Sequence, residues 1–308
     1  MLDALHIFAI SRGQILKYKT IISAAVFSIL SLSSALSAEF ESPEIFVLGD
    51  SQFLFGSGPA FHDFFLNIDE HCSTDSDFRQ NVKTLKNAST GVLGVRSTSL
   101  DSWVKRDDES KKRICSVDPN WHINASMFGS IKYSDERFLQ IGQEEPFKLC
   151  QQKRSAFEVM FEKQYFDPKL FIMYFLGNSA NRWAESQADA TADVLAALQQ
   201  IPANMPCIFM TTAPPHRQNM VDTRFKGQEN LRKAFKEVGN HCTFVDGLTP
   251  ETIKANVGND HHFKFNVKAG KVKDVFHPNA NGAKRFLALK KADICQAVSK
   301  QFSSKVIQ

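Results

Sequence analysis

The stretch Val47-Leu48-Gly49-Asp50-Ser51-Gln52 organises the sequence, because an apolar run ends there in a small, polar turn. With Ile45 and Phe46 before it, the run is typical of a buried strand that leads into a loop. In an open sheet of parallel strands, chemistry gathers at the carboxyl ends of the strands. Ser51 falls at such an end, and a serine becomes a useful nucleophile when a base lies beside it.

Strand and helix patterns alternate along the rest of the chain. Apolar runs predict strands at 170–176, 207–210 and 243–245, with a shorter strand within 79–93, and residues 251–273 are expected to be mostly loop. Helical spacing of apolar residues predicts helices near 60–68, 157–165, 184–200, 231–238 and 281–302. This alternation predicts the α/β class, with a parallel sheet covered by helices on both faces.

One long connection interrupts the alternation, at about 105–150, where the sequence is polar and irregular. Connections of this length usually carry structure of their own or a function such as a lid. We expect an insertion that contains a hairpin and is closed by a Cys115–Cys150 disulfide. An equally acceptable interpretation is a surface excursion that packs on the sheet.

The N-terminal residues 1–38 have the layout of a secretory signal peptide. Arg12, Lys17 and Lys19 precede the uncharged, mostly apolar run from Ile21 to Leu36, and small residues close it at Ser37-Ala38. The alternative is an uncleaved membrane anchor, but the run is short for a span and rich in serine. We therefore predict an exported protein with a single domain at 39–308 and no stable membrane span after cleavage, located in the periplasm or secreted.

Charge and cysteine content narrow the function classes further. The net charge is +4 with dispersed basic residues, which gives no nucleic-acid footprint. The six cysteines all follow the signal segment, and an even number in an exported chain suggests disulfides whose pairing spacing alone does not decide. Asp260-His261-His262 lacks a defined set of partner ligands, so we predict a polar loop there and neither a metal site nor a cofactor.

A candidate base follows near the other end of the chain, in Asp274-Val275-Phe276-His277-Pro278. The spacing of three residues lets one turn hold the Asp274 carboxylate against one imidazole nitrogen of His277 while the other nitrogen faces Ser51. Further polar residues follow predicted strands at Asn178 and around Asp246. Arg182, Trp183 and His216 lie just after predicted strand ends, where contact with substrate and a role in packing are equally acceptable interpretations. Acyl transfer needs a nucleophile, a base, a group that orients the base, and donors for the oxyanion.

These residues, in this order, resemble the SGNH (GDSL-like) hydrolases across most of residues 44–303. The resemblance lies in Gly49-Asp50-Ser51, in Gly177-Asn178 after a central strand, and in the segment 274–278. It implies a three-layer α/β/α fold with a flavodoxin-like, five-stranded parallel sheet. It also implies Ser51 as nucleophile, His277 as general base and Asp274 as its orienter. The oxyanion hole would combine the Ser51 N–H, a backbone N–H at Gly94 and the Asn178 side chain.

Three departures from the family pattern concern the oxyanion hole and the substrate. Ser179 replaces the aspartate that usually follows the asparagine, Gln52 stands where leucine is common, and Arg96 or Ser97 could occupy the position assigned to Gly94. The resemblance implies an esterase that removes O-acetyl groups from an envelope or secreted carbohydrate. Two alternatives remain: a carbohydrate O-acyltransferase that uses the same triad, and a non-catalytic polysaccharide-binding or envelope-binding module with a relic site.

Overall fold

The central sheet has seven strands, and five of them are parallel. In the order β2-β1-β5-β6-β7, the parallel strands are Thr90–Val95, Ile45–Gly49, Leu170–Tyr174, Cys207–Met210 and Cys242–Val245. This confirms the predicted flavodoxin-like arrangement.

The computed structural model describes residues 42–106, 127–132, 138–140, 149, 153–162, 166–239 and 241–303. The signal segment 1–38 and the Cys115–Cys150 pair lie outside these residues.

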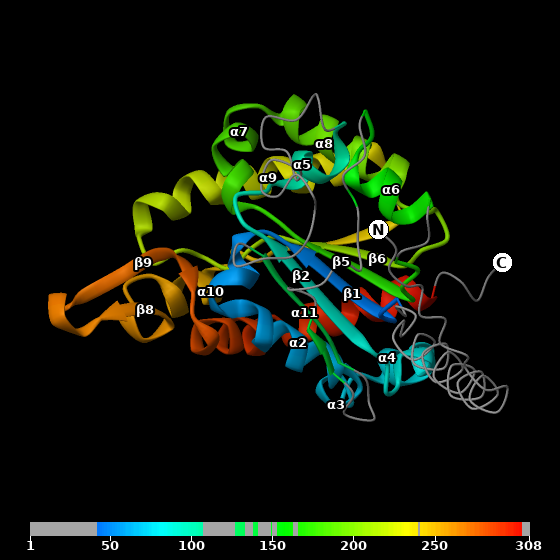
Figure 1. Cartoon of the computed structure of the whole chain (residues 1–308), viewed down its shortest axis with the longest axis horizontal. Coiled ribbons are helices and arrows are strands. Elements are labelled where there is room, and N and C mark those ends of the chain that lie inside the picture. Colours follow the sequence, from blue (N-terminus) through cyan, green and yellow to red (C-terminus); the bar gives the residue numbers. More distant parts are fainter. Residues whose placement is uncertain are drawn as a thin grey trace, which may run out of the picture. The chain divides into compact units, whose positions relative to one another are not determined.

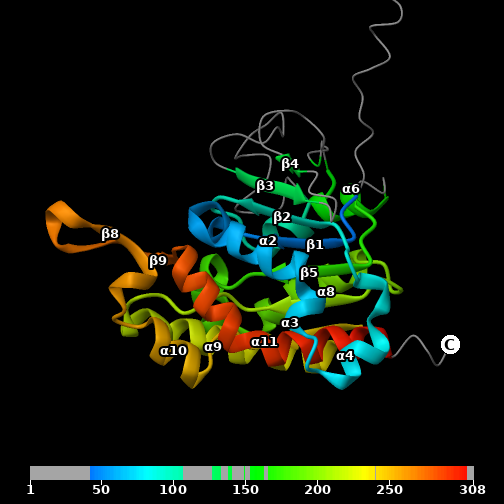
Figure 2. The same ribbon diagram turned by 90° about the horizontal axis from the view of Figure 1, so that it is seen from below.

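Strands β3 (Met127–Lys132) and β4 (Phe138–Gln140) add an antiparallel extension to the sheet. β3 pairs with β2, and β4 pairs with β3, so the edge of the sheet next to β2 belongs to the long connection. Figure 2 shows β4, β3, β2 and β1 side by side. The hairpin expected in the insertion is therefore present, and the sheet has two strands more than its parallel part.

Helices cover the sheet on both faces, as predicted (Figures 1 and 2). One layer holds α2 (Gly58–Leu66), α3 (Ile68–His71), α4 (Ser76–Asn81) and α11 (Ala280–Ser303). The other holds α5 (Leu100–Val104), α6 (Ala156–Glu162), α7 (Ala180–Glu185), α8 (Gln187–Gln200) and α9 (Gln218–Val238). The result is the three-layer α/β/α architecture.

Alternation along the strands divides the core between the two layers. Ile45 and Val47 face the layer of α2 and α11, where they join Phe61, Phe286 and other buried apolar side chains. Phe46 faces the opposite way and stacks on Phe166, with ring centroids 4.0 Å apart. Because both faces are buried, the strand is a continuous apolar run in the sequence.

The segment 251–273 is more ordered than a loop, which corrects that prediction. It contains α10 (Pro250–Asn256), β8 (Phe263–Asn266) and the start of β9 (Lys271–Pro278), and β8 and β9 form an antiparallel hairpin. Short helical turns fill the rest, η5 at Asp260–His262 and η6 at Val267–Ala269. The hairpin was missed because lysines alternate with its apolar residues and most of its side chains are exposed. Because these strands are not buried, their sequence contains no continuous apolar run that would indicate a strand.

Two disulfides join distant parts of the described chain. Cys72, at the end of α3, is bonded to Cys295 in α11, and Cys207 in β6 is bonded to Cys242 in β7. His241 lies close to the second pair, but sulfur atoms joined in a disulfide are not available as thiolate ligands for a metal ion.

Among the helices of the described ranges, none is long and apolar enough to cross a bilayer.

Candidate active site

Two glycines make room for the turn that carries Ser51. β1 ends at Gly49, which pairs with Gly94 of β2, and helical backbone begins directly at Ser51. A Cβ on Gly49 would lie 2.7 Å from the Phe53 ring, and one on Gly94 would lie 2.9 Å from the carbonyl oxygen of Asp50. The sharp return of the chain over the strand end requires both glycines, and it leaves Ser51 at the carboxyl edge of the sheet.

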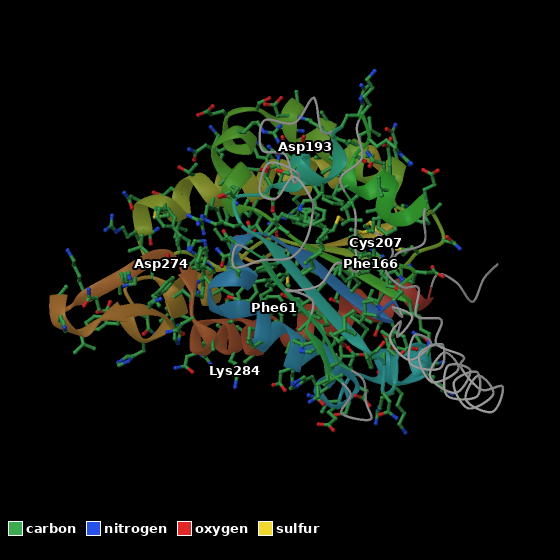
Figure 3. All side chains as sticks on the ribbon, viewed as in Figure 1. Phe61, Phe166, Asp193, Cys207, Asp274 and Lys284 are labelled. Atoms are coloured by element: carbon green, nitrogen blue, oxygen red, sulfur yellow. A yellow bond between two sulfur atoms is a disulfide. The ribbon has the colours of Figure 1, made fainter. Side chains whose placement is uncertain are left out.

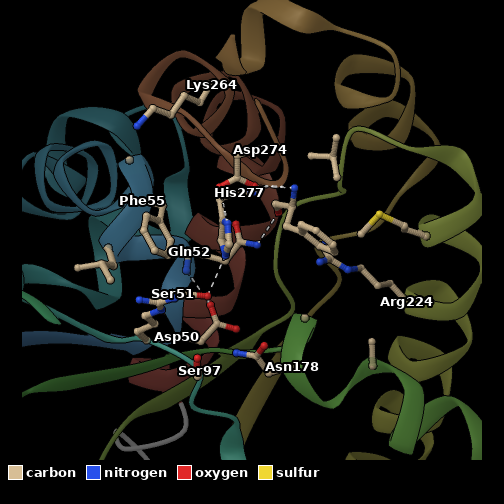
Figure 4. A pocket seen from close by; sticks show the side chains of 18 of the residues that line it. Asp50, Ser51, Gln52, Phe55, Ser97, Asn178, Arg224, Lys264, Asp274 and His277 are labelled. Atoms are coloured by element: carbon tan, nitrogen blue, oxygen red, sulfur yellow. Dashed lines mark hydrogen bonds and ion pairs between the residues drawn. The ribbon is translucent and has the colours of Figure 1, made fainter. Parts of the chain in front are cut away.

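Ser51, His277 and Asp274 form a continuous hydrogen-bonded chain (Figure 4). Ser51 Oγ lies 2.9 Å from His277 Nε2, and His277 Nδ1 lies 2.8 Å from Asp274 Oδ2. An ionised carboxylate can only accept, so Nδ1 carries the ring proton and Nε2 is left to accept the Ser51 hydroxyl proton. The structure thus brings together residues that are 226 positions apart.

Asp274 is held by more than the histidine. Its Oδ1 accepts the backbone N–H groups of Phe276, at 2.9 Å, and of His277, at 3.1 Å. Burial alone would raise the pKa of the Asp274 carboxyl, but the hydrogen bonds from His277 and the backbone hold that pKa below its usual value. Asp274 is therefore ionised at neutral pH and can orient the imidazole.

The loop that carries His277 is fixed through its backbone carbonyls. Gln52 Nε2 donates to the Phe276 carbonyl at 3.0 Å, and the N–H of His216 donates to the Val275 carbonyl at 2.9 Å. Ser57 Oγ donates to the Pro278 carbonyl at 3.3 Å. Two of these three donors lie within six residues of Ser51, so the turn that presents the serine also sets the position of the imidazole.

Asn178 enters the same site from the turn after β5. It lies in η4 (Gly177–Ser179), and its Nδ2 donates to the Thr98 carbonyl at 2.6 Å. An asparagine amide has a second N–H, and the side chain lines the cavity in front of Ser51. The hydrogen bond to Thr98 connects the loop after β5 to the loop after β2.

Gly94 lies inside β2, one residue before its end, and packs against the Phe53 side chain. The residues that line the cavity from this loop are Arg96 and Ser97. Ser97 has a φ of 62°, in the left-handed region that glycine adopts most easily. The assignment of an oxyanion donor to Gly94 stays a prediction, and the lining favours the turn at Ser97 as the place of a backbone donor.

A cavity of about 1240 Å³ opens in front of Ser51. Arg224 of α9 lines it and is 6% exposed. A Cβ on Gly177 would lie 3.3 Å from Arg224 Nη2 and 3.9 Å from Asp50 Oδ2, so both charged groups lie close to the Gly177-Asn178 turn. Burial lowers the pKa of the Arg224 guanidinium, while attraction to Asp50 acts in the opposite direction.

Four other polar residues expected near the site bind elsewhere. Arg182 and Trp183 both donate to the fully buried carboxylate of Asp193, the Trp183 Nε1 at 2.9 Å. Arg232 of α9 binds Asp246, and His216 Nε2 lies 2.9 Å from Asp260 Oδ1. These side chains tie elements together and are absent from the lining of the cavity in the described chain. His216 still acts on the site through its backbone N–H.

Three residues at the site could not be given a role from the sequence alone. Gln52 had only been noted as a departure from leucine, and Arg224 lies within a helix whose other charges suggest an exposed surface. The exposed Phe55 ring lies 4.8 Å from the His277 ring. The unusual backbone of η1 (Phe53–Ser57), with Gly56 at a φ of 135°, turns Phe55 toward the cavity. Gly56 is the one signal of this turn that the sequence contains.

Comparison with known proteins finds similarity only at the level of structure. Neither a protein-family model nor a curated protein matches the chain. One similar solved structure is a DUF4886 family protein from Bacteroides uniformis, at 10% identity and a TM-score of 0.43, covering 87% of this chain and 95% of that one. Another is a peptidoglycan O-acetylesterase, at 12% identity and a TM-score of 0.36, covering 88% and 95%. Both are distant similarities of fold.

Proposed function

We propose that the protein is an exported serine esterase that removes O-acetyl groups from carbohydrate through an acyl-enzyme. The observation that carries the proposal is the hydrogen-bonded chain Ser51–His277–Asp274 at the mouth of a large cavity. A serine, a histidine in the tautomer that accepts its proton, and an ionised carboxylate are the parts that acyl transfer requires.

In the proposed reaction, Ser51 Oγ attacks the ester carbonyl carbon while its proton passes to His277 Nε2. The tetrahedral intermediate collapses, the C–O bond to the sugar breaks, and His277 gives the proton to the departing sugar oxygen. Water then attacks the acyl-enzyme, again losing a proton to His277, and acetate is released as Ser51 regains its hydrogen. Asp274 holds the imidazole in place and stabilises the cation that forms in each half of the reaction.

The negative charge that develops on the carbonyl oxygen needs donors at fixed positions. We assign these to the Ser51 N–H, to Asn178 Nδ2 and to a backbone N–H of the turn at Ser97, in place of Gly94. The hydrogen bond from Asn178 to Thr98 supports this assignment, because it holds the two loops at one distance from each other. The buried Arg224 adds positive charge beside the Gly177-Asn178 turn.

The cavity and the cysteines support the choice of substrate and location. A volume of about 1240 Å³ is larger than the ~300–1,000 Å³ of most small-molecule sites, which suits a carbohydrate chain. The two disulfides are expected in an oxidising compartment, and the segment 1–38 has the layout of an export signal. A periplasmic or secreted location agrees with both.

The test is acetate release by purified protein from p-nitrophenyl acetate and from acetylated polysaccharides, with Ser51→Ala in parallel. Wild type should release acetate and Ser51→Ala should be slower by at least about a thousandfold. A matched control is Ser299→Ala, a buried serine of α11 that is absent from the lining of the cavity.

Product analysis in the presence of a sugar acceptor separates the alternatives. Acetate as the sole product supports the esterase, and acetylated acceptor supports the acyltransferase. Equal rates for wild type and Ser51→Ala, with both proteins folded by circular dichroism, would overturn the catalytic role of Ser51. Binding of polysaccharide without any turnover would favour the binding module.

A further inference from the structure

The hairpin formed by β8 and β9 concentrates basic charge beside the candidate active site. Its four lysines, Lys264, Lys268, Lys271 and Lys273, are all exposed. Asp274 is the single acidic residue between 263 and 278, and it is bound to His277. Within the described chain none of the four lysines takes part in an ion pair. The hairpin therefore presents a net charge of about three that its own fold does not neutralise.

The positive charge continues from the hairpin into the cavity. Lys264 and Lys273 line the same cavity as Ser51, and the exposed Arg96 lines it from the loop after β2. The two carboxylates of the lining are already engaged, Asp274 with His277 and Asp50 with its own turn through the N–H of Gln52. Figure 4 shows Lys264 on the side of the cavity above Asp274 and His277. A bound molecule therefore meets uncompensated cations on two sides.

Apolar side chains are exposed along the hairpin and at the cavity, which Phe55 and Phe276 line. Phe265 of β8 and Phe276 of β9 are 42% and 50% exposed, Val267 between the strands is 84% exposed, and Phe55 is 44% exposed beside His277. These are four of the six large apolar residues that the described chain exposes. Large exposed apolar patches on a protein surface mark interaction sites or ligand-binding grooves. Flat rings among lysines suit a ligand with both apolar ring faces and negative charge.

We infer that the surface formed by the hairpin β8–β9, Phe55 and Arg96 binds an anionic carbohydrate chain, so that the substrate is an acetylated polysaccharide rich in carboxylates. The inference rests on the proposed esterase function, since it names the substrate of that site. Sugar ring faces lie against Phe265 and Phe276, carboxylates lie near the lysines, and an acetylated unit reaches Ser51. In Figure 1 the hairpin extends away from the carboxyl ends of the sheet strands, where the site lies, so the surface continues beyond the cavity.

An anionic membrane surface is the other partner that lysines and exposed phenylalanines attract. The carbohydrate is favoured because the charge does not stop at the hairpin. Lys264, Lys273 and Arg96 lie on the walls of the cavity, where a chain can enter and a bilayer surface cannot. The cavity volume of about 1240 Å³ also favours a carbohydrate chain as the ligand.

The experiment measures acetate release from acetylated polygalacturonate, which is anionic, and from acetylated glucomannan, which is neutral. Wild type should prefer the anionic polymer, and 0.5 M NaCl should reduce the preference because it screens exposed charges. Lys268→Gln/Lys271→Gln, at the far end of the hairpin, should lower the ratio of the two rates by about fivefold. Lys284→Gln/Lys291→Gln removes the same charge from exposed positions of α11 and should leave the ratio as in wild type.

Binding by Ser51→Ala separates this inference from the proposed function. Retardation of that variant by unacetylated polygalacturonate in affinity electrophoresis, reduced by the hairpin substitutions, supports the surface even when no ester is cleaved. Turnover that depends on Ser51 but shows equal rates on both polymers and no retardation would overturn the surface and leave the esterase standing. Binding to phosphatidylglycerol vesicles without retardation by polygalacturonate would overturn it in favour of a membrane.

Discussion

The Gln52 side chain donates a hydrogen bond to the Phe276 carbonyl at 3.0 Å, so the residue after the proposed nucleophile holds the loop that carries the proposed base. Gln52 is 2% exposed, and the contact joins two segments 224 positions apart in the sequence. Preorganised contacts of this kind set the geometry on which proton transfer depends. Since Gln52 is next to Ser51 and Phe276 is next to His277, this hydrogen bond helps to fix the distance between Ser51 and His277.

Gln52→Leu should lower kcat with little change in KM. The substitution keeps the approximate size of the side chain and removes a buried hydrogen bond of about 1 kcal/mol, which leaves the Phe276 carbonyl without this donor. A fall in kcat of about fivefold to fiftyfold is expected on p-nitrophenyl acetate, together with a small loss of stability. Gln218→Leu, at an exposed position of α9, is the control. An unchanged kcat in a folded Gln52→Leu protein would contradict the positioning role.

Asp274→Asn should reduce kcat by about a hundredfold to ten-thousandfold, because the amide favours the wrong histidine tautomer. It should also change the acid sensitivity of the fold. Burial alone would raise the pKa of Asp274, yet the hydrogen bond from His277 keeps the pKa below its usual value. A carboxyl with a depressed pKa in the folded state stabilises fully above its unfolded pKa, about 3.9, and this stability is lost as the pH falls through the folded pKa.

Urea unfolding at pH 7 and pH 3 measures this contribution. Wild type should lose more stability between the two pH values than Asp274→Asn, since the variant has no carboxyl to protonate at this position. Equal losses would show that the hydrogen bonds of Asp274 do not depend on its charge.

Asp193→Ala should destabilise the protein strongly. The carboxylate is fully buried and accepts from Arg182 and from Trp183 Nε1, so its removal leaves the buried indole N–H unpaired and takes from Arg182 its nearer carboxylate partner. A cost of about 3–5 kcal/mol in the free energy of unfolding is expected. Asp222→Ala, at an exposed position of α9, should cost less than about 0.5 kcal/mol. Similar costs for the two variants would contradict a structural role for Asp193, which Figure 3 shows among the helices of the layer that contains α8.

Cys72→Ala/Cys295→Ala should lower the stability of the protein and leave its site intact. The disulfide joins α3 to α11 across 223 positions, and closing so long a loop restricts the unfolded chain. A loss of about 2–5 kcal/mol is expected from denaturant unfolding. Activity at 25 °C should remain within about twofold of wild type in the folded fraction, since neither cysteine contacts the cavity. A midpoint equal to that of wild type would show that the bond does not stabilise the fold.

Most of the parallel strands could be predicted because they are apolar runs, whereas their flavodoxin-like order was expected only from the family resemblance. Ser51, His277 and Asp274 could be proposed because their spacing resembles a known motif. The remaining features depend on contacts that no local pattern contains. Arg224 is a charged residue in a long amphipathic helix, and its burial results from the packing of α9 beside the Gly177 turn.

The hairpin β8–β9 illustrates the same limit. Its strands pair only with each other and leave lysines in solvent, so the sequence lacks the apolar signal by which strands are found. At Gly94 the sequence offered two interpretations, because a glycine near a strand end suits either a backbone N–H that binds an oxyanion or the close packing of another side chain. Its contact with Phe53 explains the glycine without reference to substrate.

Covalent labelling of the folded protein with a fluorophosphonate, followed by intact mass and peptide mapping, tests most directly whether Ser51 is a nucleophile activated by His277. We expect one adduct per chain, on Ser51, and a labelling rate at least about a hundredfold lower in His277→Ala. Labelling of Ser51→Ala at the wild-type rate, or a folded wild-type protein that takes no label, would contradict this role of Ser51.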